Sequence, residues 1–121
     1  MHKVDIHIEK VESHPEIVRI QINGPLDTVA SYTFQEKMDA LIQGHVYKFI
    51  VDLEHLDYIS SAGIGVFPRM ALDLQKNHGG LVFIKVSEKI RKLFAMIGLT
   101  TIFEIKNSLE EALKEFEMHE S

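Results

Sequence analysis

Two short apolar runs restrict the folds open to this chain more than any other feature. They are YKFIVDL at residues 47–53 and LVFIKV at residues 81–86. Such runs are typical of strands that are buried on both faces of a parallel sheet. Between them, apolar residues recur at helical spacing, namely Ile64, Phe67, Ala71 and Leu74. The pattern predicts two parallel strands joined by a crossover helix that begins near Ser61 and ends near NHGG at residues 77–80.

The N-terminal part of the chain predicts a hairpin followed by a helix. VDIHI at residues 4–8 and IVRIQI at residues 17–22 alternate apolar and polar side chains, as half-buried strands do. These strands would turn near His14-Pro15. NGP at residues 23–25 is a turn signal, and the apolar spacing after it predicts a helix over residues 28–43.

The C-terminal part predicts two helices and one strand. Ser87 can cap a helix that ends before Gly98, and TIFEI at residues 101–105 has the pattern of a last short strand. Ser108 and Glu111 form a capping box for a terminal helix. We therefore expect an α/β fold: one domain over residues 1–121, with a central mixed sheet of about four to five strands and about four α-helices.

Charge and composition exclude several classes of function. The chain has 13 Lys and Arg against 18 Asp and Glu, a net charge of -5, and its basic residues are scattered. A nucleic-acid partner is therefore not expected, because such a partner requires a basic patch. The absence of cysteine excludes disulfides and thiolate metal sites. MHKVDIHIEK lacks the apolar core of a signal peptide, and no segment approaches the ~20 apolar residues of a membrane helix, so we expect a cytoplasmic protein without a membrane partner.

The segment YISSAGIGVF, residues 58–67, follows the first apolar run and holds the candidate functional residues. Open α/β sheets place function in the loops beyond the carboxyl ends of their strands. A structural interpretation is also open. Gly63 and Gly65 would then allow a tight turn and close packing, and Ser60 or Ser61 would cap the helix.

Pro68 conflicts with a simple helix after this segment. It lacks the N–H that would pair with Ile64, and an uncompensated proline inside a helix costs ~3 kcal/mol. We therefore expect an irregular segment from Gly63 to Gly65, with the regular helix starting nearer Phe67.

Named catalytic patterns do not fit this segment. SAGIG lacks the glycine two residues before the serine that a nucleophile elbow requires, and GIGVFP lacks the third glycine of a dinucleotide fingerprint. His55, Asp57 and Ser61 are the residue types of a hydrolytic triad, but triad members meet through tertiary geometry rather than closeness in sequence. The seven histidines do not show H-E-x-x-H spacing. We therefore expect no enzymatic activity, no metal and no cofactor.

FIVDLEHLDYISSAGIGVF at residues 49–67 resembles the central signature of the STAS domain of anti-sigma factor antagonists. In that family a strand ending in D-L is followed by a short loop, a small-residue pair with the phosphorylated serine, and a glycine-containing turn. The resemblance extends to INGPLDTVASYTFQEKMDAL at residues 22–41. It also covers the closing strand, helix, strand and helix at residues 79–113.

The resemblance implies a switch protein rather than an enzyme. Members of the family bind an anti-sigma factor, itself a serine kinase in the best-known systems, and so free a sigma factor for transcription. Phosphorylation by that kinase would switch binding off, and a metal-dependent serine phosphatase would restore it. By position the phosphorylated residue falls on Ser61, with Ser60 as second choice. Many members have aspartate where this chain has Ser60.

The candidate partner-binding residues surround this serine: Asp27, Asp57, Ser60, Ser61, Ala62, Gly63 and Gly65. Two of them have structural alternatives, since Asp27 can cap the first helix and Asp57 can organise its own turn.

Other functions also stay open at the level of sequence. Met96, Ile97 and Leu99 surround the IGL turn, and Met70 lies on the helix after the serines. These residues are candidates for a docking patch or a ligand pocket, or for core packing. The domain could also be a regulatory scaffold without a phosphorylation cycle, or could bind a nucleotide or a lipid. Both a monomer and a weak dimer agree with the sequence.

Overall fold

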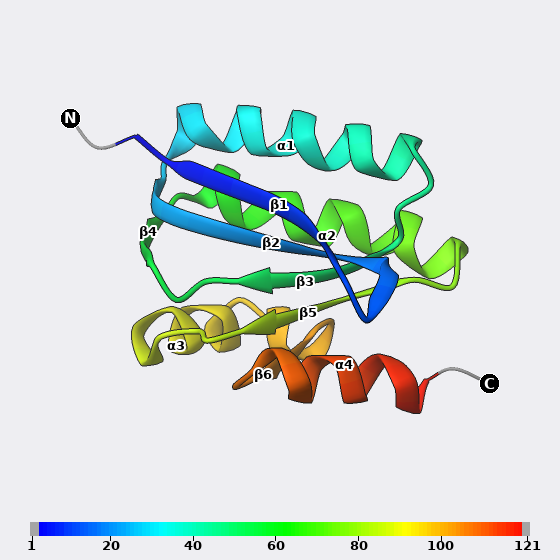
Figure 1. Ribbon diagram of the computed structural model, residues 1–121. Helices are drawn as coiled ribbons and strands as arrows, with labels where there is room; N and C mark the ends of the chain where they lie inside the picture. Colours follow the sequence, from blue (N-terminus) through cyan, green and yellow to red (C-terminus); the bar gives the residue numbers. More distant parts are fainter. Residues whose placement is uncertain (1–2, 120–121) are drawn as a thin grey trace.

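A mixed sheet flanked by helices on both faces forms the protein, as seen in a computed structural model that describes residues 3–119 (Figure 1). Within those residues the elements are β1 (Asp5–Val11), β2 (His14–Leu26), α1 (Thr28–Gln43), β3 (Lys48–Asp52), β4 (Leu56–Ile59), α2 (Ser61–Lys76), β5 (Gly80–Ile84), α3 (Glu88–Met96), the 3-10 turn η1 (Leu99–Thr101), β6 (Glu104–Lys106) and α4 (Leu109–Met118). The predicted α/β architecture with four helices is confirmed. No helix in this part of the chain has the length and apolar character needed to cross a membrane.

The strands follow the order β1-β2-β3-β5-β6, with β4 paired to β2 outside that path. β1 and β2 form the predicted antiparallel hairpin, and the other pairs are parallel. The two apolar runs become β3 and β5, which pair directly with each other. The crossover that connects them contains α2. The chain thus forms the parallel pair that its apolar pattern predicts.

The end of β2 differs from the prediction. The NGP segment was expected to be a turn, but it lies inside β2, where Gly24 adopts a φ of 97°. The register shifts between Gly24 and Pro25, and β2 changes its partner there from β3 to β4. Glycine permits this backbone conformation without a Cβ clash. The bend extends β2 and adds β4, a strand that the sequence did not indicate.

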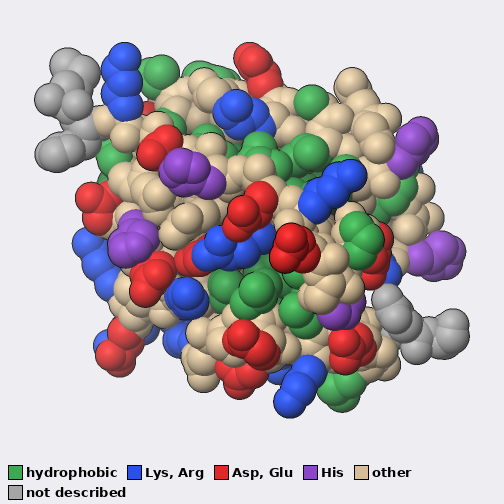
Figure 2. Space-filling view, viewed as in Figure 1, with side chains coloured by type: hydrophobic (Ala, Val, Ile, Leu, Met, Phe, Trp, Pro, Cys, Tyr) green, Lys and Arg blue, Asp and Glu red, His purple; other side chains and the backbone are tan. Residues whose placement is uncertain are grey.

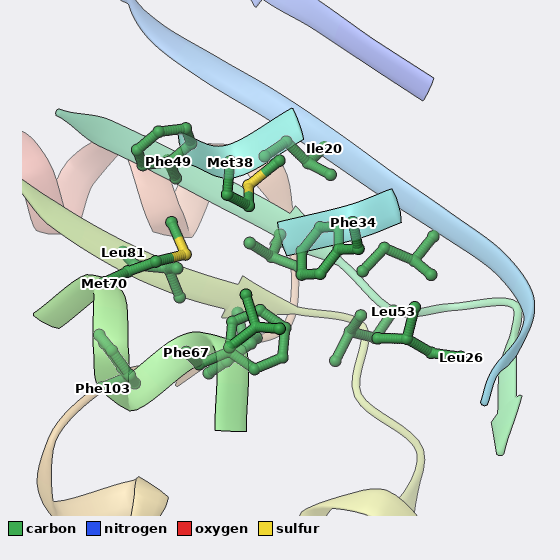
Figure 3. Packing of buried hydrophobic residues seen from close by; sticks show 14 of the residues in the cluster. Ile20, Leu26, Phe34, Met38, Phe49, Leu53, Phe67, Met70, Leu81 and Phe103 are labelled. Carbon is green, nitrogen blue, oxygen red and sulfur yellow. The ribbon is translucent and has the colours of Figure 1, made fainter. Parts of the chain in front are cut away.

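The face of the sheet that carries α1, α2 and α3 holds an aromatic core. Phe83 of β5 lies at its centre, with ring centroids 5.0 Å from Phe67, 5.0 Å from Phe94 and 5.7 Å from Phe103. Phe34 of α1 extends this cluster through Phe67, at 5.6 Å. Figure 3 shows side chains of α1 and α2 directed toward the strands from two neighbouring helices. This packing fixes both helices on the sheet.

The opposite face is covered in part by α4. Alternate residues of β2, β3 and β5 point to this side and pack with α4 in a second, smaller cluster, formed by Val11, Ile17, Ile50, Val82, Ile84, Ala112 and Phe116. The same face carries polar groups: Arg19 of β2 bonds to the fully buried Asp52 of β3 and to Glu9 of β1. Figure 2 shows acidic and basic side chains intermixed on the side that faces the viewer.

Helix α2 runs without interruption through Pro68, so the irregular segment expected at residues 63–65 is wrong. The first turn is closed by a regular bond, in which Ile64 N–H donates to the Ser60 carbonyl at 2.9 Å. Val66, Phe67 and Met70 are buried on one side of the helix and hold it against the sheet. Pro68 lies on the exposed side, where it removes one backbone donor without a buried clash.

Candidate functional site

Two helix N-termini lie side by side at one end of the sheet. In the parallel pairing of β2 with β4, Leu26 stands opposite Ile59, and Ser60 N–H donates to the Leu26 carbonyl at 2.9 Å. The next residues, Asp27 and Ser60, are the N-caps of α1 and α2. The pairing of β4 therefore brings together the two loops that the sequence singled out.

Ser60 is the cap of α2. Its hydroxyl oxygen accepts a hydrogen bond from Gly63 N–H at 3.1 Å, and the residue is only 7% exposed. This bond satisfies one of the donors that a helix leaves unpaired at its start. The hydroxyl of Ser60 is thus buried and engaged in holding the helix.

Ser61 is the first residue of α2 and is exposed, as is the following Ala62. Its hydroxyl lies at the positive end of the helix dipole, where backbone N–H groups also favour an anion. Ser61 is therefore exposed to solvent at a position where a helix favours negative charge.

The two glycines of the segment have different surroundings. A Cβ on Gly63 would lie 3.0 Å from Ile59 and 3.1 Å from Leu26, whereas a Cβ on Gly65 would have nothing within 4 Å. Gly63 is buried, and its missing side chain lets α2 approach the strand ends closely. Packing therefore explains Gly63, while the space at Gly65 is open.

The two predicted aspartates occupy different local structures. Asp27 caps α1, with its Oδ1 accepting from Ala30 N–H at 2.8 Å, so its structural alternative is confirmed. Asp57 lies within β4 and is exposed, so it does not organise a turn. Both residues are exposed to solvent.

Of the triad residue types, His55 lies beside an acidic neighbour in the chain, Glu54. His55 Nε2 lies 3.7 Å from Glu54 Oε1, and both side chains are exposed in the turn between β3 and β4. Among residues 3–119, no group of three or more His, Asp and Glu side chains is placed to hold a metal ion.

The apolar candidates named from the sequence separate into a buried pair and an exposed pair. Met70 and Leu99 are buried in the core, so the core-packing alternative is confirmed for them. Met96 and Ile97 are exposed. Sequence reasoning did not single out Tyr58, Lys89 or Leu93, which lie near Met96 around a groove between β4 and α3. The signal available in the sequence was the position of Tyr58, two residues before Ser60. Its exposure became visible only in the structure.

Comparisons with known proteins identify the family of this chain. The family model of the STAS domain matches residues 9–112. An anti-sigma-B factor antagonist of Listeria monocytogenes is 33% identical over 107 residues, which cover 86% of this chain and 91% of that protein.

Two solved structures of related proteins also resemble this chain. The Bacillus cell fate determinant SpoIIAA in its phosphorylated form matches with a TM-score of 0.72 and 27% identity, over 92% of this chain and 98% of that one. An anti-sigma factor antagonist of Mycobacterium paratuberculosis matches with a TM-score of 0.83 over 95% of each chain. Its identity of 16% shows likeness of fold alone.

Proposed function

The chain belongs to the STAS domain family, among the anti-sigma factor antagonists, and we propose that it binds an anti-sigma factor and so frees a sigma factor for transcription. The match of the family model over residues 9–112 and the similarity to the Listeria anti-sigma-B factor antagonist support this proposal. The surface around Ser61 is the binding surface in this account, with Asp27, Asp57 and Ala62 exposed around it.

Phosphorylation of Ser61 switches this binding off. The observation that carries the assignment is the difference between the two serines, because Ser61 is exposed whereas the hydroxyl of Ser60 is buried in the cap of α2. A kinase must bring the acceptor hydroxyl to its own bound nucleotide. Ser61 meets that requirement without a change in the fold, and Ser60 would first have to release Gly63.

The switch acts by local charge. A phosphoryl group adds about -1.5 to -2 charges at the N-terminus of α2, where the helix dipole accommodates it. A partner docked over Ser61 would face a solvated dianion in addition to the exposed Asp27 and Asp57. Leaving such a charge badly paired in an interface costs several kcal/mol, and each ~1.4 kcal/mol weakens affinity tenfold. Repulsion and desolvation therefore release the partner while the domain stays folded.

Two partners follow from this cycle. The anti-sigma factor acts as the kinase for Ser61, and a metal-dependent serine phosphatase removes the phosphoryl group. Both act in the cytoplasm, where the sigma factor is used. The exposed position of Ser61 serves the phosphatase as well as the kinase.

The test compares Ser61→Asp with Ser61→Asn, which has nearly the same size but no charge. Dissociation constants are measured with purified anti-sigma factors from the genome that encodes this chain. Ser61→Asp is expected to bind at least about tenfold more weakly than Ser61→Asn, with unchanged thermal unfolding. Equal affinities of the two variants would contradict the charge mechanism. Failure of the wild-type protein to bind any of these anti-sigma factors would contradict the function itself.

A further inference from the structure

A groove of about 390 Å³ lies between β4 and α3, next to the serines. One wall is residues 57–59 of β4, and the other is a face of α3 that includes Lys89, Lys92, Leu93 and Met96. Ile59, at the end of the first wall, directly precedes Ser60. Figure 1 shows β4 and α3 at the same end of the sheet. We call this feature the α3 groove.

The rim of the α3 groove exposes large apolar side chains. Met96 is 84% exposed and Tyr58 is 52% exposed, and they lie on opposite walls. Methionine is flexible and polarizable, and tyrosine offers a large rigid surface, so both are suited to contact with a partner. The groove can take one apolar side chain between them.

The charge of α3 is opposite to that of the whole chain. The helix carries Lys89, Arg91 and Lys92 against Glu88, whereas the chain has a net charge of -5. Lys92 is partly balanced by Glu88, with Nζ 3.6 Å from Oε1, and Lys89 stands beside it on the groove. Asp57 places one carboxylate on the β4 wall, so the basic charge of the groove lies on its α3 wall. That wall favours a partner segment with acidic residues.

We propose that the α3 groove is a second docking site for the anti-sigma factor and takes an apolar side chain flanked by acidic residues. This inference rests on the proposed function, because it extends the partner's surface from Ser61 across β4 to α3. The groove holds the partner at a position that phosphorylation does not alter. Specificity for one anti-sigma factor over another then depends on α3, while Ser61 controls release.

The apolar part of this proposal is tested with a matched pair of methionines. Met96 ends α3 and Met118 ends α4, and they are 84% and 76% exposed. Met96→Ala is expected to weaken binding of the purified anti-sigma factor by about tenfold, as buried interface anchors do. Met118→Ala is expected to leave affinity unchanged, because α4 lies on the other face of the sheet.

The electrostatic part is tested with Lys89→Glu and the control Lys114→Glu, which makes the same charge change on an exposed residue of α4. Lys89→Glu is expected to lower the association rate about tenfold at low salt, and the loss should shrink as salt rises. Lys114→Glu should change the rate much less.

The outcomes separate this inference from the proposed function. Weaker binding of Met96→Ala and Lys89→Glu, with both controls unchanged, supports the α3 groove. If Ser61→Asp weakens binding while Met96→Ala and Lys89→Glu bind like the wild type, the groove is not a docking site and the proposed function stands. If the wild-type protein binds none of the anti-sigma factors, both are overturned.

Discussion

The two faces of the sheet are built in different ways. The face under α1, α2 and α3 is an aromatic core, in which Phe83 contacts three other phenylalanine rings. The face under α4 combines a smaller apolar cluster with the charged pair of Arg19 and Asp52. Aromatic burial supplies free energy of folding, whereas a buried ion pair contributes geometry more than stability. The aromatic face therefore contributes most of the stability and holds α1 and α2 on the sheet, while the polar face adds a geometric constraint near the end of β3.

Asp52 shows how the polar face shapes the site. Its Oδ2 accepts from Arg19 Nη2 at 2.5 Å, and its Oδ1 accepts from Glu54 N–H at 3.0 Å. The second bond holds the turn that leads from β3 into β4. β4 ends directly before Ser60, so this turn lies on the path of the chain from β3 to the start of α2.

The largest expected effect comes from the aromatic face. Phe83→Ala should destabilise the protein by about 3 to 5 kcal/mol, because it empties the centre of the core. Phe116→Ala on the α4 face should cost less, since Phe116 is 9% exposed and lies at the edge of the smaller cluster. Chemical unfolding of both variants measures the difference. Equal losses would mean that the two faces stabilise the fold alike.

The polar face is broken by Arg19→Met, which leaves the fully buried Asp52 without its charged partner. The arginine side chain is 22% exposed, so we expect a loss of about 2 to 3 kcal/mol, below the ~3 to 5 kcal/mol seen when a fully buried pair is broken. The double variant Arg19→Met, Asp52→Asn removes the unpaired charge and should recover part of that loss. Unfolding in urea checks both values, and no recovery would contradict the role given to the pair.

A smaller effect is expected at the cap of α2. Ser60→Ala should cost about 1 kcal/mol, because Gly63 N–H loses its acceptor, whereas Ser61→Ala should change stability by less than about 0.5 kcal/mol. Thermal unfolding of the two variants distinguishes them. A larger loss in Ser61→Ala would show that the roles of the serines are reversed.

The smallest effect concerns how the free energy of unfolding depends on pH, through Glu115 of α4. A hydrogen bond from His119 holds the pKa of Glu115 below its ordinary value of 4.5, with help from Lys106 and against the opposing effect of burial. The resulting stability is present above pH 4.5 and is lost as the pH falls through the lowered folded-state pKa.

Glu115→Gln should therefore be less stable than the wild type by up to about 1 kcal/mol at neutral pH, with the gap closing in acid. Urea unfolding at several pH values follows this gap. A gap that stays constant with pH would assign the loss to packing rather than charge.

Much of the fold could be predicted from local signals. Ser87 and Ser108 cap α3 and α4 as their spacing indicated, and the side chain of Glu111 accepts from Asn107 N–H at 3.1 Å. β4 could not be predicted, because it is four residues long and its two central residues, Asp57 and Tyr58, are both exposed, so it shows no apolar alternation. Its existence depends on the register shift at Gly24, which is a tertiary feature.

The sequence predicted the segment of the candidate site but could not assign the local roles of its two serines. Two adjacent serines before a helix are equivalent in pattern, and either can be a cap. Only the position of the backbone determines which hydroxyl turns inward to Gly63 and which remains outside. Asp52 was likewise visible as part of the first apolar run, but its contact with Arg19 joins residues 33 positions apart.

The most direct test of the central claim is to map the modified residue. Wild-type protein, Ser60→Ala and Ser61→Ala are each incubated with the anti-sigma factor kinase and ATP, and the products are analysed by mass spectrometry. We predict a phosphoryl group on Ser61 in the wild type and in Ser60→Ala, and none in Ser61→Ala. Modification that persists in Ser61→Ala and disappears in Ser60→Ala would contradict the account.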